Sequence, residues 1–284
     1  MVESMCNRKI QLTKEEIAHY RKEGYVIPEY RLPESLVARL REMLDRLIAD
    51  NPTVRPEGLM GVHIPQGYGS GIRGRKEFFE LAVHPEILDM TEQLIGPNIC
   101  LWGTQMFCKP SGIGREVPWH QDGEYWPINP LATVTAWVAF EDSTAENGCM
   151  RVIPRSHENK LVYSHFVSQR KDLALNRALE AGTFDESKSV NIELKAGQIS
   201  FHDIFLVHGS NPNRSSQRRA GYTLRYMPTS SHFDRTISNK ENTPCSDKTN
   251  VLNFSTRPIW LVRGIDCCGK NDFTIGHKNN DYCQ

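Results

Sequence analysis

The sequence predicts an α+β protein with a mainly β core, in which N-terminal helices pack on a jelly roll. Amphipathic helical patterns occupy about residues 10–97. From residue 98 to about 228, short runs rich in β-branched and aromatic residues follow one another, with turn residues between most of them. No internal repeat or linker marks off a second domain, so we expect residues 1–284 to form one domain with a C-terminal extension at 229–284.

The N-terminal part reads as three helices and one short strand. The capping box at Thr13–Glu16 predicts a helix that runs to about Lys22. Residues 25–27 follow as a short strand. A second helix begins after Pro33 with apolar residues at helical spacing, and a third spans residues 85–95.

A long stretch at residues 51–74 is irregular and rich in Gly and Pro. Loops of this length inside a compact domain are usually lids or disordered segments. We expect a lid, from which His63, Arg73 and Arg75 contact a ligand. Each of these side chains also fits an ordinary solvated loop.

Short strands dominate the rest of the chain, and regularly spaced short strands are typical of sandwiches and barrels. The predicted strands are 99–109, 133–140, 149–153, 190–194, 198–202, 206–208 and 222–227. Residues 167–181 interrupt them with a helical pattern.

The composition excludes several classes of protein. Acidic and basic residues balance at 34 each, which argues against nucleic acid or an anionic membrane surface as a partner. No apolar run reaches the length of a membrane span, and the N-terminus lacks the pattern of a secretory signal. The eight cysteines include no C-x-x-C pair, so we expect reduced thiols and a cytoplasmic protein.

Side chains that could bind a metal ion occur in one stretch around His120 and Asp122. On a strand, residues two apart face the same way, so the imidazole and the carboxylate would point together. A second histidine, either His202 or His208, would complete a 2-His-1-carboxylate triad, which binds Fe(II) and leaves positions open. The H-x-D spacing alone is short and equally fits a polar strand end.

Arginines follow this region at the start of the last predicted strand. Arg219 and Arg225 share strand parity and would face one side of the sheet. An Fe(II) enzyme with a keto-acid co-substrate needs a fixed cation for the far carboxylate, and the planar guanidinium suits that task.

Four motifs in this order resemble the phytanoyl-CoA dioxygenase family. They are His120-x-Asp122, N-G-C-M-R-V-I-P-R-S-H at 147–157, H-G-S-x-x-N at 208–213, and Arg219. Members of this family are Fe(II)/2-oxoglutarate oxygenases with a double-stranded β-helix, a cupin-like jelly roll. The resemblance extends over about residues 15–227.

The resemblance implies a role for each matching residue. It makes His120, Asp122 and His208 the metal ligands and leaves His202 as a pocket residue. Arg219, eleven positions after His208, would bind the distal carboxylate of 2-oxoglutarate. Three further residues would lie beside this co-substrate: Ser210, Gln105 and Trp137.

Substrate contacts are less well defined by sequence. The candidates are Tyr125, Trp126, His202, Arg225, His63 and Arg73. Core packing or structural ion pairs explain each of them about as well.

The resemblance implies an Fe(II)/2-oxoglutarate-dependent dioxygenase that uses O2 and hydroxylates, desaturates or cyclises an unactivated C–H of a small molecule, releasing succinate and CO2. Related halogenases carry Ala or Gly in place of Asp122, so halogenation is disfavoured. No coenzyme A site or peroxisomal address is evident, which favours a free small molecule over a phytanoyl thioester. The sequence is also compatible with a homodimer. The alternatives are a non-catalytic jelly-roll binding protein and a metal-dependent hydrolase, neither of which needs Arg219.

Overall fold

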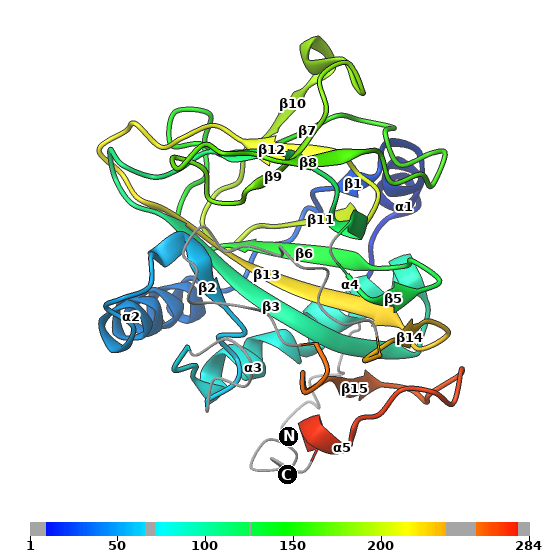
Figure 1. Cartoon of the computed structure of the whole chain (residues 1–284). Helices are drawn as coiled ribbons and strands as arrows, with labels where there is room; N and C mark the ends of the chain where they lie inside the picture. The colour runs from blue at the N-terminus through cyan, green and yellow to red at the C-terminus, as the bar shows by residue number, and fades with distance from the viewer. Residues whose placement is uncertain (1–9, 66–71, 125, 237–253, 278–284) are drawn as a thin grey trace.

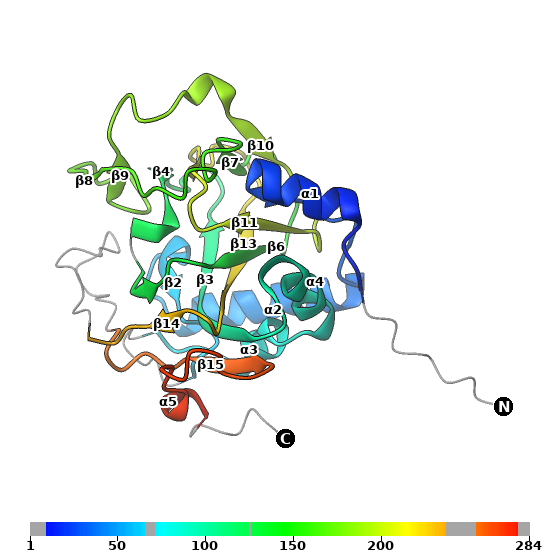
Figure 2. The same cartoon turned by 90° about the vertical axis from the view of Figure 1, so that its right-hand side faces the viewer.

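A computed structural model describes residues 10–65, 72–124, 126–236 and 254–277. Two β-sheets lie over one another, and helices cover the outer face of the larger sheet (Figure 1). The same layers are visible after a quarter turn (Figure 2). The predicted mainly β core with N-terminal helices is therefore confirmed.

The larger sheet has seven strands in the order β1-β11-β6-β13-β3-β15, with β2 also paired to β3. All its pairs are antiparallel. Its strands are β1 (Tyr25–Val26), β2 (Leu59–Met60), β3 (Ile99–Lys109), β6 (Val134–Ala139), β11 (Ile199–Asp203), β13 (Arg219–Pro228) and β15 (Trp260–Arg263).

The smaller sheet has four strands in the order β10-β7-β12-β4, and two further strand pairs lie outside both sheets. The four strands are β4 (Val117–His120), β7 (Met150–Val152), β10 (Val190–Ile192) and β12 (His208–Ser210). The outer pairs are β5 (Ile128–Asn129) with β14 (His232–Phe233), and β8 (His165–Val167) with β9 (Arg177–Leu179).

Helices form the third layer. They are α1 (Lys14–Glu23), α2 (Glu34–Asp50), α3 (Lys76–Ala82), α4 (Pro85–Ile95) and α5 (Thr274–His277), with 3-10 turns η1 (Pro56–Gly58), η2 (Asp122–Glu124) and η3 (Glu186–Lys188). The capping box predicted at Thr13 is present, and Gly24 ends α1 with a φ of 85°. The three predicted helices are confirmed, whereas α3 was not predicted. None of the helices within the described ranges is long and apolar enough to cross a membrane.

Strand β13 separates the core from the cavity by simple alternation. Tyr222 and Tyr226 point to the helices, where their hydroxyls donate to the carbonyls of Phe78 (3.2 Å) and Ala82 (2.7 Å). Arg219, Thr223 and Arg225 have the opposite parity and line a cavity between the sheets. The period of two along a strand therefore puts charged groups on one face and the apolar core on the other.

The helix predicted within residues 167–181 is wrong. This segment contains turns and the short antiparallel pair β8–β9, in which His165 lies opposite Leu179. Leu173 and Ala174 are buried by contact with the chain around Glu116, whose carbonyl accepts from the Ala174 N–H at 2.7 Å. The apolar spacing thus reflects separate tertiary contacts.

The C-terminal segment is an integral part of the fold. Strand β15 pairs with β3 at the edge of the larger sheet. Arg263 at its end contacts Asp89 (2.9 Å) and Glu92 (2.7 Å) of α4. Residues after 229 therefore add a strand to the sheet that supports the cavity.

Candidate metal and co-substrate site

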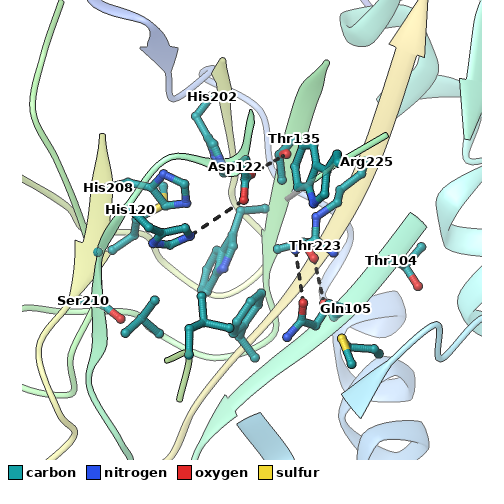
Figure 3. A pocket seen from close by; sticks show the side chains of 18 of the residues that line it. Thr104, Gln105, His120, Asp122, Thr135, His202, His208, Ser210, Thr223 and Arg225 are labelled. Carbon is teal, nitrogen blue, oxygen red and sulfur yellow. Dashed lines mark hydrogen bonds and ion pairs between the residues drawn. The ribbon is translucent and has the colours of Figure 1, made fainter. Parts of the chain in front are cut away.

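Three buried side chains converge on the cavity side of the smaller sheet: His120, Asp122 and His208. One ligand atom from each lies within 4.8 Å of the others. His208 on β12 lies directly opposite His120 on β4, and their ring centroids are 4.2 Å apart. Asp122 Oδ1 lies 3.8 Å from His120 Nε2 (Figure 3).

Asp122 reaches this cluster by a different route from the one expected. Strand β4 ends at His120, and Asp122 begins the 3-10 turn η2, so the two residues do not share a strand. Gln121 anchors the turn, because its buried amide donates to the carbonyls of Phe205 (2.6 Å) and Leu161 (3.0 Å). No pattern in the sequence indicates this role of Gln121.

Hydrogen bonds determine which histidine nitrogens face the cluster. The Nδ1 atoms of His120 and His208 lie 2.9 Å from the carbonyl oxygens of Pro118 and Leu206, so we assign the proton to Nδ1. Nε2 of each ring is then an acceptor that can bind a metal ion.

Electrostatics favour the forms that bind metal. Burial lowers the pKa of His120 to about 4 and lowers the pKa of His208 well below its usual value, so both rings are neutral at pH 7. Burial alone would raise the pKa of the Asp122 carboxyl, but His202, His208 and Arg225 outweigh it and lower that pKa. Two neutral imidazoles and one carboxylate are the donor set of a 2-His-1-carboxylate iron site, so the residues fit this metal.

His202 lies behind the carboxylate. Its Nε2 atom is 3.6 Å from Asp122 Oδ2, and its ring centroid is 4.8 Å from that of His208. Thr135 donates to the same carboxylate oxygen at 3.5 Å. His202 thus lines the cavity and orients Asp122, and it is not a member of the three-residue cluster.

A buried cation lies in the same cavity. Arg219 is 2% exposed, and its guanidinium packs over the ring of Trp137 at 5.3 Å. Burial lowers its pKa to about 10, so it stays charged at pH 7. Within the described ranges no carboxylate lies within 4.0 Å of it, and its Nε has no hydrogen-bond partner. An unpaired buried guanidinium is costly unless an anion binds to it.

Lys109 is a second buried basic residue near Arg219, and burial and the charge of Arg219 lower the pKa of its amine well below the usual value. It is 1% exposed, and its Nζ donates to Ser210 Oγ (2.7 Å) and to the carbonyls of Ser210 and Asn211. A charged residue at the end of a strand that is otherwise apolar except for Thr104 and Gln105 is the one signal in the sequence that could have revealed it.

Gln105, Trp126 and Arg225 lie at another part of the cavity lining. The Arg225 Nη2 donates to Gln105 Oε1 at 3.2 Å, and its guanidinium lies 5.1 Å from the Trp126 ring. The structure therefore places Gln105 beside Arg225, and Trp126 is half-buried in the cavity wall.

The structure contradicts the lid contacts expected of His63, Arg73 and Arg75. His63 is buried and does not line the cavity itself; its Nδ1 lies 2.7 Å from Oγ1 of Thr104, which does, and its ring packs on Trp260 at 4.8 Å. Arg73 is exposed and lines no part of the cavity. Arg75 forms an ion pair with Asp50 at 2.5 Å.

Residues 66–71 of the expected lid and Tyr125 of the substrate set lie outside the described residues.

The sequence model of the phytanoyl-CoA dioxygenase (PhyH) family matches residues 20–221, most of the chain. The chain belongs to the phytanoyl-CoA dioxygenase family. This membership confirms the resemblance and the predicted class of enzyme, an oxygenase with non-haem iron and 2-oxoglutarate.

The sequence identity to individual relatives is low. A phytanoyl-CoA dioxygenase domain-containing protein 1 homolog of Dictyostelium discoideum is 34% identical over 53% of this chain and 54% of its own length. The peroxisomal phytanoyl-CoA dioxygenase of Homo sapiens is 26% identical over 78% of this chain and 70% of its own length. The first match thus spans about half of that relative.

Solved structures share the fold. The non-heme monooxygenase ThoJ in its apo form has a TM-score of 0.68 at 23% identity, over 94% of this chain and 93% of that one. The non-heme alpha ketoglutarate dependent epimerase SnoN from nogalamycin biosynthesis has a TM-score of 0.64 at 23% identity, over 84% and 91%. At this identity the likeness supports the fold alone.

Proposed function

We propose that this member of the family uses Fe(II), O2 and 2-oxoglutarate to oxidise an unactivated C–H bond of a small molecule. His120, Asp122 and His208 hold the iron, and Arg219 with Ser210 holds the distal carboxylate of 2-oxoglutarate. The observation that carries this proposal is that buried Arg219, which has no ion-pair partner among the described residues, lies in the same cavity as the three-residue cluster.

We also propose that the two stacked sheets form a double-stranded β-helix, the jelly roll expected of the family. The order β10-β7-β12-β4 over a larger antiparallel sheet supports this assignment. The predicted cytoplasmic location and homodimer stay predictions.

The protein's contribution to the reaction is binding, orientation and exclusion of water. A ferrous ion with 2-oxoglutarate, when bound, supplies the activation of O2 that such an oxidation requires. The Nδ1–H bonds to Pro118 and Leu206 fix the tautomers of both histidines, and His202 and Thr135 hold Asp122.

At the co-substrate end, Arg219 offers a guanidinium fork to a carboxylate, and Trp137 fixes its plane. Lys109 holds Ser210 next to it by donating to the hydroxyl oxygen. The overall reaction converts O2, 2-oxoglutarate and R–H into succinate, CO2 and R–OH, and desaturation or ring closure replaces hydroxylation where the substrate allows it.

The two rival functions do not explain Arg219. A binding protein on this fold has no need for three convergent metal ligands together with an unpaired cation. A hydrolase needs a metal-bound water but no anchor for a dicarboxylic acid.

Metal analysis and 2-oxoglutarate titration test the proposal. We expect one iron per chain, and His208→Ala should reduce iron binding at least about 10-fold. His19→Ala, on the exposed face of α1, is the matched control and should bind normally. Arg219→Met should abolish measurable 2-oxoglutarate binding but retain iron. Iron-independent 2-oxoglutarate binding, or full binding by Arg219→Met, would contradict the assignment.

A further inference from the structure

A second pair of buried arginines lines the cavity away from Arg219. Arg225 lies six residues further along β13 on the same face, about 20 Å of strand at the usual rise. Arg257 comes from the C-terminal segment and lines the same cavity. The two guanidinium groups therefore form a separate basic region, which we call the arginine pair.

Aromatic rings hold the arginine pair in place. Arg225 lies 5.9 Å from the Trp102 ring and 5.1 Å from the Trp126 ring. Arg257 lies 5.8 Å from Trp102, and its Nε donates to the Trp102 carbonyl at 2.9 Å. Ring faces attract cations without neutralising them, so the charge remains available to a ligand.

Among the described residues no carboxylate forms an ion pair with either arginine, and Asp122 attracts Arg225 only from beyond ion-pair distance. Arg225 and Arg257 are 9% and 6% exposed, and neither has a carboxylate within 4.0 Å in that part of the chain. Two buried donors nearby, Arg225 Nε and Trp102 Nε1, have no hydrogen-bond partner among the described residues. Buried charges and donors without partners are costly, and they indicate the position of a missing acceptor.

The charge balance of the cavity points the same way. Its lining contains three arginines and a single carboxylate, that of Asp122. In the proposed function, the negative charges of Asp122 and the diacid co-substrate balance the positive charges of the ferrous ion and Arg219. The remaining positive charge is concentrated at the arginine pair.

The cavity continues from the metal ligands to the arginine pair, because both sets of side chains line it. The free space in it amounts to about 1010 Å³ when the open solvent at its mouth is included. Met60, Phe107, Leu175 and Phe254 supply an apolar wall. A compound with an acidic group at one end and an apolar body fits both features.

We propose that the substrate is a small organic acid whose anionic oxygens, of a carboxylate or a phosphonate or phosphate group, bind Arg225 and Arg257 between Trp102 and Trp126. Its body extends toward the iron site, where the C–H bond is oxidised. This inference rests on the proposed function and adds the chemical class of the substrate to it. Arg257 is then a specificity-determining residue supplied by the C-terminal segment.

The test uses simple probes on the full chain under anaerobic conditions, with Fe(II) and saturating 2-oxoglutarate. Butanoate, propylphosphonate and the neutral butanamide are titrated, and tryptophan fluorescence is followed because Trp102 and Trp126 adjoin the site. We expect saturable binding of at least one anion and at least tenfold weaker binding of butanamide. The two anion arms identify the preferred acid group.

Variants link this binding to the arginine pair. Arg225→Met and Arg257→Met should each weaken anion binding at least tenfold and change 2-oxoglutarate affinity less than twofold. Arg257→Lys should restore part of the loss. Arg39→Met, an exposed arginine paired with Glu80 on the helical layer, is the control and should leave both unchanged.

Equal binding of butanamide, or anion affinity within twofold of the parent in both Met variants, would overturn the proposal. Folding is checked by thermal unfolding with and without the anion. We expect the anion to raise Tm of the parent but not of the Met variants, which a purely structural role would not produce. Absence of 2-oxoglutarate binding together with anion binding at the pair would overturn the proposed function and leave this site standing.

Discussion

Gly221 has no side chain because the indole of Trp137 occupies the space beside it. A Cβ at this position would lie 1.8 Å from Trp137 Cζ2. Trp137 in turn supports the guanidinium of Arg219. The fit of three residues on two adjacent strands therefore sets the position of the proposed co-substrate anchor.

Gly221→Ala should displace Trp137 and disturb Arg219. We expect a loss of stability of about 1–3 kcal/mol from overpacking and clearly weaker 2-oxoglutarate binding. Urea unfolding and 2-oxoglutarate titration measure the two effects. Unchanged affinity would mean that Trp137 does not position the anchor.

Lys109→Met tests the buried amine beside Arg219. It removes the donor that holds Ser210 Oγ. Because a buried polar group left without its partner costs about 1–3 kcal/mol, we expect 2-oxoglutarate affinity to fall about tenfold. Lys195→Met, an exposed lysine paired with Asp142, is the matched control. Equal affinities in the two variants would remove Lys109 from the site.

The residue-level predictions from sequence were good where a motif was local. His120 and Asp122 were identified by spacing and do converge, although through a strand end and a 3-10 turn. The side chains that hold them come from remote segments, as Gln121 shows by binding Phe205. Such long-range contacts leave no pattern in a single sequence, and Arg257 was missed for the same reason.

At the scale of elements, the spacing of apolar residues correctly predicted which helix faces are buried and where the main strand lies. Helix α2 buries Val37, Leu40 and Leu44 as its apolar spacing indicated, and β3 has the predicted bounds. The helix predicted within residues 167–181 is wrong because leucines that contact different neighbours fall at helical spacing by coincidence. The edge strand β15 was not predicted, since its pairing with β3 joins residues far apart in the chain.

Strand β15 supplies a direct test of the C-terminal segment. Trp260 is 3% exposed, packs on Phe79 at 5.2 Å, and donates from Nε1 to the Gly276 carbonyl at 2.9 Å. Trp260→Ala should reduce the free energy of unfolding by about 3–5 kcal/mol. Ile265→Ala, at a position 67% exposed, should change it by less than about 0.5 kcal/mol. Similar values for both variants in urea unfolding would mean that β15 is not part of the core.

For the whole molecule, the site combines three regions of the chain. The smaller sheet and the turn η2 bring the metal ligands, β13 brings two arginines, and the C-terminal segment brings Arg257. The larger sheet and its helices hold these three regions in position relative to one another. Binding of ligands that bridge the two sheets should therefore stabilise the entire fold.

Removal of metal and co-substrate should lower the stability of the protein as a whole. At 100 times the Kd, a ligand adds about 2.7 kcal/mol to the folded state, which corresponds to a rise in Tm of about 5 °C for a chain of this size. We expect this rise when Fe(II) and 2-oxoglutarate are added anaerobically to chelator-treated protein. Arg219→Met should keep the part due to iron and lose the part due to 2-oxoglutarate. A full response in Arg219→Met would be inconsistent with one shared site.

An anaerobic crystal structure with Fe(II) and 2-oxoglutarate tests the central claim most directly. It should show iron on His120, Asp122 and His208, and the distal carboxylate of 2-oxoglutarate on Arg219 next to Ser210. Iron bound by His202 in place of His208, or the diacid bound at Arg225 and Arg257 with Arg219 left free, would contradict it.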